Sequence, residues 1–375
     1  MILLIPGPVT TRAEVRAEMA RDIAPWDDDF RVVSRRIRQR VRELAGGGVE
    51  THTALPLQGC GHFGTEAALR SVLPPGGRIL IPDTGSYAER MAKLATAAGR
   101  TPVMLKVDRN RAVPPHRIAD ALAADESLTH AGLVYSETST GVIQNIQEIG
   151  RAIRATGRRV VLDAVSAFGA LPLNLMDHPE IDTAIFTTNK CLEGLPGMCF
   201  IVVQNNRLLP AGTAASWSFD LADIYEHSIR TEGGAFRFTP AAQVIQAFDT
   251  ALNFFDAEGG QPARLTRYNA NRDALRAGMI RIGLTPCLDA ADQGPIVMNI
   301  HAPGDPAWSL PNFVTELKSR GFTISNFYDT EEPSFRVGCI GHITPDDMTR
   351  FSVAADQSLT AMGVVQRTPQ ATHSL

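Results

Sequence analysis

The sequence has 375 residues, 44% hydrophobic and 20% charged, as expected of a globular protein long enough for about two domains. Its formal net charge of -4 gives no overall positive field, which argues against a nucleic-acid partner. No apolar run is long enough to cross a bilayer, and the N-terminus lacks the basic region and cleavage site of a signal peptide.

The five cysteines (Cys60, Cys191, Cys199, Cys287 and Cys339) are scattered, with no CxxC pair and no His/Cys cluster at zinc spacing. We therefore expect reduced thiols, no metal site and a cytoplasmic protein.

From about residue 60 the chain alternates helical segments with short apolar ones, the pattern of an α/β sheet. We predict helices over Gly64–Leu73, Tyr87–Ala98 and Ile146–Thr156, and strands over Arg78–Ile81, Ala131–Tyr135, Val160–Leu162 and Thr183–Phe186. Short apolar strands separated by helices favour a mostly parallel sheet that is buried on both faces.

A domain boundary is predicted at Ala257–Pro262, which reads as a linker or tight turn. A helix through Arg281 follows, and then shorter segments such as Ile296–Ile300 and Phe335–Gly338, which fit a smaller α+β domain. We predict an N-terminal segment (1–15), a large domain (16–256), a small domain (257–365) and a frayed polar tail (366–375).

Polar residues follow the predicted strands where those strands end. Asp83, the loop Ser136–Gly141, Asp163 and Lys190 all take such positions. In open α/β sheets the ligand crevice lies at the carboxyl ends of the strands, so we expect these residues to converge on one site.

The glycines at Gly59, Gly61 and Gly64 match GxGxxG, and Asp83 follows at about the distance of the acidic residue in a dinucleotide-binding unit. Two features argue against that interpretation. Pro56 is a poor residue for the central strand that should come first, and such a unit usually opens its domain. Glycines that begin a helix still favour a phosphate cradle.

Asp163 and Lys190 stand at the ends of successive predicted strands, downstream of that cradle. Pyridoxal phosphate requires an anion beside its pyridine nitrogen, an amine for the Schiff base and a phosphate site. The alternative interpretation is that Asp163 caps a helix and Lys190 lies on the surface. The three elements in this chain order favour the cofactor.

The sequence resembles the fold-type I pyridoxal phosphate enzymes, and among them the 2-aminoethylphosphonate–pyruvate aminotransferases. The resemblance covers nearly the whole chain and rests on Leu3–Pro8, Trp26–Asp29, Gln58–Gly61, Ser136–Gly141, Asp163–Ser166, Asn189–Lys190 and Phe335–Gly338. Several of these motifs are shared with alanine– and serine–glyoxylate aminotransferases.

The resemblance implies roles for residues around the cofactor ring. Lys190 is implied as the Schiff-base lysine and proton carrier, Asp163 as the partner of the pyridinium nitrogen and Val165 as the residue beneath the ring. Tyr87 is implied to stack on the opposite face, with a core aromatic as the alternative. Thr138 matches a hydroxyl position near the phenolic oxygen of the cofactor.

The phosphate is implied to lie against Cys60, Gly61 and His62, with Asn189 also in reach. Cys60 stands where the family has serine, and because a thiol is a weak donor the cradle depends more on amides and on His62. Thr239 matches a phosphate contact donated by the partner subunit, which implies a homodimer with the active site at the interface.

Arg336 is the implied clamp for the anionic group of each substrate, with an inter-domain salt bridge as the alternative. The turn at Pro6–Pro8 in the N-terminal segment is implied to fold over the site. The implied reaction converts 2-aminoethylphosphonate and pyruvate to phosphonoacetaldehyde and alanine. Serine– or alanine–glyoxylate transamination, and an ammonia-lyase acting on a related amino-phosphonate, remain open alternatives.

Overall fold

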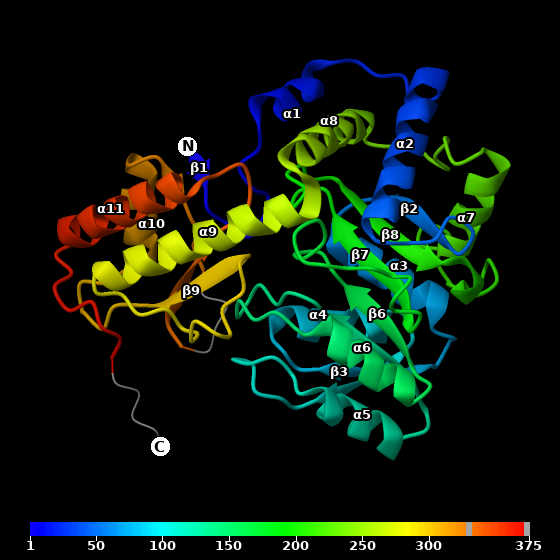
Figure 1. Ribbon diagram of the computed structural model, residues 1–375, viewed down its shortest axis with the longest axis horizontal. Helices are drawn as coiled ribbons and strands as arrows, with labels where there is room; N and C mark the ends of the chain where they lie inside the picture. The colour runs from blue at the N-terminus through cyan, green and yellow to red at the C-terminus, as the bar shows by residue number, and fades with distance from the viewer. Residues whose placement is uncertain (328–331, 371–375) are drawn as a thin grey trace.

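The computed structural model describes residues 1–327 and 332–370. Two bodies of secondary structure are visible in Figure 1, one built on a large sheet and the other on a smaller helical layer with short strands. The helix α9 (Gly260–Arg281) runs from the first body into the second.

The large sheet has seven strands in the order β2-β8-β7-β6-β5-β3-β4. Neighbouring strands from β7 to β4 are parallel, whereas β8 runs antiparallel to both of its neighbours. The bounds are β2 His52–Gln58, β3 Arg78–Pro82, β4 Thr101–Leu105, β5 Leu128–Val134, β6 Arg159–Asp163, β7 Ile181–Thr187 and β8 Met198–Gln204.

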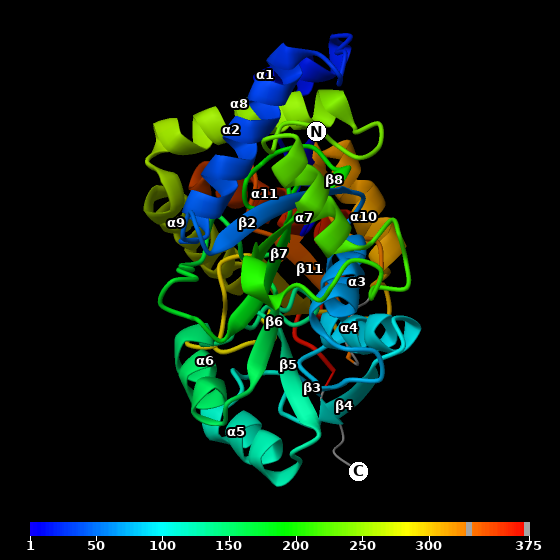
Figure 2. The same cartoon turned by 90° about the vertical axis from the view of Figure 1, so that its right-hand side faces the viewer.

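Helices cover both faces of this sheet (Figure 2). Residues of α2 (Asp28–Leu44), α5 (Pro115–Ala124), α6 (Ile146–Ala155) and α8 (Ala242–Glu258) share one apolar cluster with one face. Residues of α3 (Gly61–Val72), α4 (Ser86–Ala97) and α7 (Leu221–Arg230) share another cluster with the opposite face. Along β6, Val160 and Leu162 point to the first cluster and Val161 to the second, as the period of two in a strand requires.

The smaller body contains two short strand pairs. β9 (Val297–His301) pairs antiparallel with β11 (Ser334–Gly338), and β1 (Ile2–Leu3) pairs in parallel with β10 (Phe322–Thr323). These strands, α9, α10 (Leu310–Ser319) and α11 (Pro345–Ala361) enclose a separate apolar cluster. Its buried members include Leu4, so the first residues of the chain pack with its last third.

A short helix, α1 (Ala13–Ala17), connects the N-terminal strand to the large body, where it packs against α8. Within the described residues, no helix has the length and apolar character to span a membrane.

The mixed α/β fold with a mostly parallel sheet confirms the predicted fold class. Each helix and strand named from the sequence is present, with ends that differ by up to three residues. The turn predicted within residues 257–262 is a single residue, Gly259, which has a left-handed backbone (φ 109°). It joins the end of α8 directly to the start of α9.

Pro56 lies in β2, which is an edge strand of the sheet. A proline is tolerated there because its missing N–H faces away from the ladder. The predicted domain bounds stay predictions, and the part of the tail at 371–375 lies outside the described residues. Nearer the body, the backbone amides of Val365 and Gln366 both donate to the Asp305 carboxylate at 2.8 Å.

Candidate active site

A cavity of about 190 Å³ opens where the parallel strands end. Eight residues predicted from the sequence line it: Cys60, Gly61, His62, Tyr87, Asp163, Val165, Asn189 and Lys190. Six further residues complete the wall: Gly7, Thr65, Arg90, Met91, Leu94 and Thr187. The strand-end rule therefore collects the predicted residues from β2, β3, β6 and β7 into one place.

Asp163 is the last residue of β6, and its side chain is buried. Its Oδ1 accepts a hydrogen bond from the backbone N–H of Val165 at 2.9 Å. Burial, and to a lesser degree the nearby Glu137 carboxylate, raise the pKa of Asp163 to about 6. A cationic ring nitrogen placed beside this carboxylate would lower its pKa again, because the positive charge opposes the effects of burial and of Glu137.

Lys190 follows β7, and burial lowers the pKa of its ammonium group to about 8. The positive charges of Arg336 and Arg90 act in the same direction. Among the ion pairs of the described residues, none includes Lys190. An amine that is neutral near physiological pH can act as nucleophile and base.

The N-terminal segment reaches over this lysine. A Cβ atom added to Gly7 would lie 2.5 to 2.7 Å from the Cδ, Cε and Nζ atoms of Lys190. Gly7 also has a φ of 152°, a conformation that favours glycine. Any side chain at position 7 would therefore displace the amine.

The glycine motif opens α3, whose N-cap is Cys60. A Cβ atom on Gly61 would lie 2.7 Å from Cγ2 of Val165, so only glycine lets the start of α3 approach the Val165 segment. The backbone N–H groups of Gly61 and His62, the first two of α3, have no partner within the helix, and both residues line the cavity, which makes these groups donors for an anion.

His62 lies beside Tyr87, with ring centroids 6.5 Å apart and an interplanar angle of 28°. Burial lowers the pKa of His62, and the charges of Arg90 and Lys190 lower it further. A neutral imidazole can still donate one hydrogen bond. Cys60 Sγ lies 3.8 Å from His62 Nδ1, so the thiol and the imidazole share this side of the cavity.

Thr138 and Arg336 lie next to each other but do not line the cavity. Arg336 comes from β11, and its Nη1 donates to the carbonyl of Thr138 at 3.2 Å. Its guanidinium carbon also lies 4.7 Å from the ring centroid of Phe327. Within the described part of the chain, the buried Thr138 Oγ1 has no hydrogen-bond partner.

Thr239 lies apart from the other predicted residues. It lines a second cavity, of about 240 Å³, together with aromatic residues such as Phe63, Phe219 and Phe236. Within one chain it therefore takes no part in the Lys190 cavity, and its role towards a partner subunit stays a prediction.

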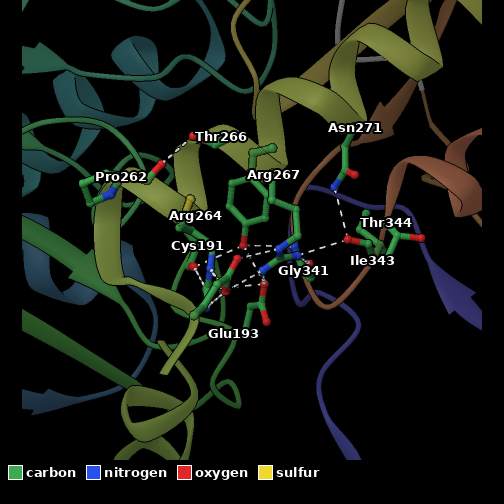
Figure 3. Close-up of polar contacts among 12 residues, drawn as sticks. Cys191, Glu193, Pro262, Arg264, Thr266, Arg267, Asn271, Gly341, Ile343 and Thr344 are labelled. Carbon is green, nitrogen blue, oxygen red and sulfur yellow. Dashed lines mark hydrogen bonds and ion pairs between the residues drawn. The ribbon is translucent and has the colours of Figure 1, made fainter. Parts of the chain in front are cut away.

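The loop after Lys190 is held by buried polar contacts (Figure 3). Glu193 Oε1 accepts from Arg267 Nη2 at 2.7 Å and from the Tyr268 hydroxyl at 2.8 Å. The same hydroxyl and Arg264 Nη1 both donate to the carbonyl of Cys191. The side chain of Arg264 is only 1% exposed.

The same face of α9 also holds the segment after β11. Arg267 Nη1 donates to the carbonyls of Gly341 and Ile343, at 2.6 and 3.1 Å. Asn271 Nδ2 donates to the carbonyls of Cys339 and Ile343, at 3.0 and 3.3 Å. Helix α9 thus connects the loop of Lys190 to the strand that carries Arg336.

The family model for class-V aminotransferases matches residues 13–316 of the chain. The chain belongs to this family. The match confirms the family that was predicted from the motifs, and with it the prediction that the chain is an enzyme. Among its relatives is a protein of Burkholderia lata named 2-aminoethylphosphonate–pyruvate transaminase 2, which is 38% identical over 97% of this chain and 96% of the relative.

A second relative of the class-V aminotransferase, from Syntrophobacter fumaroxidans, is named 2-aminoethylphosphonate–pyruvate transaminase. It is 38% identical over 96% of this chain and 97% of the relative. Among solved structures, pyridoxamine–pyruvate aminotransferase from Mesorhizobium loti superposes with a TM-score of 0.86 at 23% identity. That alignment covers 98% of this chain and 93% of that structure, and it shows a shared fold.

Sequence reasoning missed two charged residues of this class-V aminotransferase. Arg90 lies on α4 one turn after Tyr87, a spacing that places two helical residues on one face. Glu137 is buried, and its carboxylate accepts from the backbone N–H groups of Tyr87 and Ala88, both at 3.4 Å. Its Oε1 also accepts from the N–H and the hydroxyl of Ser139, in the predicted Ser136–Gly141 loop, so the loop was identified from the sequence but the bond to α4 was not.

Proposed function

We propose that the chain is a pyridoxal phosphate-dependent aminotransferase that converts 2-aminoethylphosphonate and pyruvate to phosphonoacetaldehyde and L-alanine. The substrate assignment rests on near-full-length relatives that carry this name at 38% identity. The chemistry rests on one observation: a half-buried lysine with a lowered pKa shares a cavity with a buried aspartate and a glycine-opened helix.

The residues present fit this cofactor. Asp163 offers a buried carboxylate to the ring nitrogen, and Lys190 offers the amine that would bind covalently. The amides of α3, with His62 and Asn189, would hold the phosphate. The hydroxyls of Thr138 and Thr187 are both buried without a partner among the described residues, as expected where a polar ligand completes them.

Pyridoxal phosphate, when bound, supplies an electron sink for the charge that develops on the substrate carbon. Lys190 Nζ would remove the proton from the carbon that bears nitrogen and carry it within the cavity. Asp163 keeps a negative charge opposite the ring nitrogen. Gly7 leaves room for the lysine to move, and Glu137 fixes the start of α4 that carries Tyr87.

The balance of the reaction is an exchange of an amino group for a carbonyl oxygen. The amine-bearing carbon of the phosphonate donor is oxidised to an aldehyde, and the keto carbon of pyruvate is reduced to the amine of alanine. The nitrogen is retained, so no external oxidant or reductant is required.

The test is to incubate purified protein and pyridoxal phosphate with 2-aminoethylphosphonate and pyruvate. We expect equal amounts of alanine and aldehyde, and no turnover by Lys190→Ala. Turnover only with glyoxylate and serine or alanine would overturn the substrate assignment. Ammonia release without a keto acid would indicate a lyase instead.

We also propose that Thr239 contacts the cofactor phosphate of a second copy of the chain. The aromatic cavity around Thr239 and the exposed Trp217 and Phe238 beside it support an interface on this face.

A further inference from the structure

Arg90 presents a guanidinium to the cavity that holds Lys190. It lies on α4, and its guanidinium carbon is 4.7 Å from the ring centroid of Tyr87. The residue is half-buried. Stacking on an aromatic ring fixes the plane of the guanidinium and leaves its N–H groups at the edge available for a ligand.

Among the residues that the structure describes, this guanidinium has no anionic partner. Within residues 1–327 and 332–370, no carboxylate lies at ion-pair distance from Arg90, whereas nearby arginines are paired: Arg109 contacts Asp83 and Glu89, each at 2.6 Å, and Arg70 contacts Glu66 at 2.7 Å. A cation that is partly removed from water without a counter-ion gains free energy when an anion binds beside it.

Two guanidiniums from different elements act on Lys190. Arg90 comes from α4 and Arg336 from β11, and the positive charge of each lowers the pKa of the lysine. Of the two, Arg90 lines the cavity, whereas Arg336 donates to the carbonyl of Thr138 and to Ser325 Oγ. The two guanidiniums therefore offer an anion two separate places.

The two substrates require two separate anion-binding positions. In alanine the carboxylate is attached to the carbon that bears nitrogen, whereas in 2-aminoethylphosphonate the phosphonate is attached one carbon further along. With the nitrogen-bearing carbon fixed beside Lys190, the two anionic groups cannot occupy the same place.

We propose that Arg90 binds the phosphonate group of the amino donor, while Arg336 serves the carboxylate of the keto acid. The inference rests on the proposed function and adds a specificity-determining residue to it. A cofactor phosphate has the same oxyanion chemistry, but the amides at the start of α3 already offer it donors. Arg90 is half-buried whereas Asp163 is buried, as expected if Arg90 binds an exchanging substrate and Asp163 the resident cofactor.

The experiment compares Arg90→Gln and Arg90→Lys with Lys93→Gln in the holoenzyme. Lys93 lies on the same helix, is exposed and does not line the cavity, so its variant controls for the loss of one charge. We expect Arg90→Gln to lower kcat/KM for 2-aminoethylphosphonate by roughly 10- to 100-fold, the effect of one lost charged hydrogen-bond pair. The value for pyruvate should be unchanged, and Arg90→Lys should recover part of the loss.

A binding measurement separates recognition from chemistry. Ethylphosphonate and propionate, neither of which carries an amine, are titrated as competitive inhibitors. The inhibition constant of ethylphosphonate should rise in Arg90→Gln and that of propionate should not. Equal loss for both inhibitors would overturn the assignment.

The affinity of the apoprotein for pyridoxal phosphate, measured by fluorescence, tests whether Arg90 binds the cofactor phosphate instead of the substrate phosphonate. A weaker cofactor affinity in Arg90→Gln, with an equal loss for both substrates, would assign Arg90 to the cofactor phosphate and overturn the inference. If the unmodified enzyme does not turn over 2-aminoethylphosphonate, the proposed function fails. If it does and Arg90→Gln behaves like Lys93→Gln, only the inference fails.

Discussion

At the scale of single residues, burial sets the chemistry of the site. Asp163 is buried and Lys190 half-buried, and desolvation shifts their pKa values towards each other, to about 6 and about 8. Desolvation disfavours the charged form of each group, so the lysine loses its proton more readily and the aspartate holds one more readily. A cationic ring nitrogen at Asp163 would restore its negative charge.

The lowered pKa of Lys190 predicts how the apoprotein captures pyridoxal phosphate. Only the neutral amine attacks the aldehyde, so the rate of capture should rise with pH until about 8 and then level off. Stopped-flow absorbance across a pH series measures this rate. A rise that continues to the ordinary lysine pKa of about 10.4 would contradict the role of burial, and Lys190→Ala provides the blank.

At the scale of elements, α9 holds the catalytic loop and the Arg336 segment together. Its residues Arg264, Arg267 and Tyr268 contact Glu193 and the carbonyl of Cys191 on one side. On the other side Arg267 and Asn271 hold the carbonyls that follow β11. A shift of the smaller body would therefore be transmitted to the loop of Lys190.

Removing the carboxylate of Glu193 should weaken this connection. Glu193→Gln leaves the buried Arg264 and the half-buried Arg267 with Glu258 as their remaining acidic partner, and we expect a loss of about 3 kcal/mol in unfolding free energy. Urea denaturation measures the loss. Glu50→Gln, an exposed glutamate in a turn, is the matched control. Equal stability of the two variants would show that the Glu193 contacts are not stabilising.

A positioning role for Glu193 predicts more than lost stability. In the folded Glu193→Gln holoenzyme, kcat should fall while KM for both substrates changes little, because the lysine is misplaced and the anion sites are intact. An unchanged kcat would limit Glu193 to a structural role.

At the scale of the whole molecule, Thr239 is the predicted site residue that lines a different cavity of the same chain. Thr239 lies among aromatic residues and does not line the cavity of Lys190. A second copy of the chain would supply the missing hydroxyl at its partner's cavity and cover the exposed Trp217.

Mixed dimers test this arrangement. Lys190→Ala and Thr239→Ala subunits are each expected to be impaired alone, the second through weaker cofactor binding. If Thr239 acts across the interface, a mixed dimer contains one intact site, and refolding the two variants together should restore activity at limiting cofactor. Light scattering verifies that the species is a dimer. Failure to recover activity in a confirmed mixed dimer would place Thr239 outside the partner's site.

The sequence by itself determined the family, the fold class and most of the cavity wall. Lys190, Asp163 and the Gly59–Gly64 segment could be found because each follows or opens an element whose pattern is local. The ends of parallel strands meet at one edge of a sheet, so strand order in the chain was sufficient to bring these residues together.

Only the tertiary structure decided which charges are paired. Arg90 is distinguished because no described carboxylate lies at ion-pair distance from it. Glu193 is distinguished by arginines that come from α9, about seventy residues further along the chain. Ion pairing and burial depend on side chains brought together from distant segments, so no periodic pattern in the local sequence indicates them. The chain pattern thus located the reacting lysine, and packing determined its pKa and the cations that surround it.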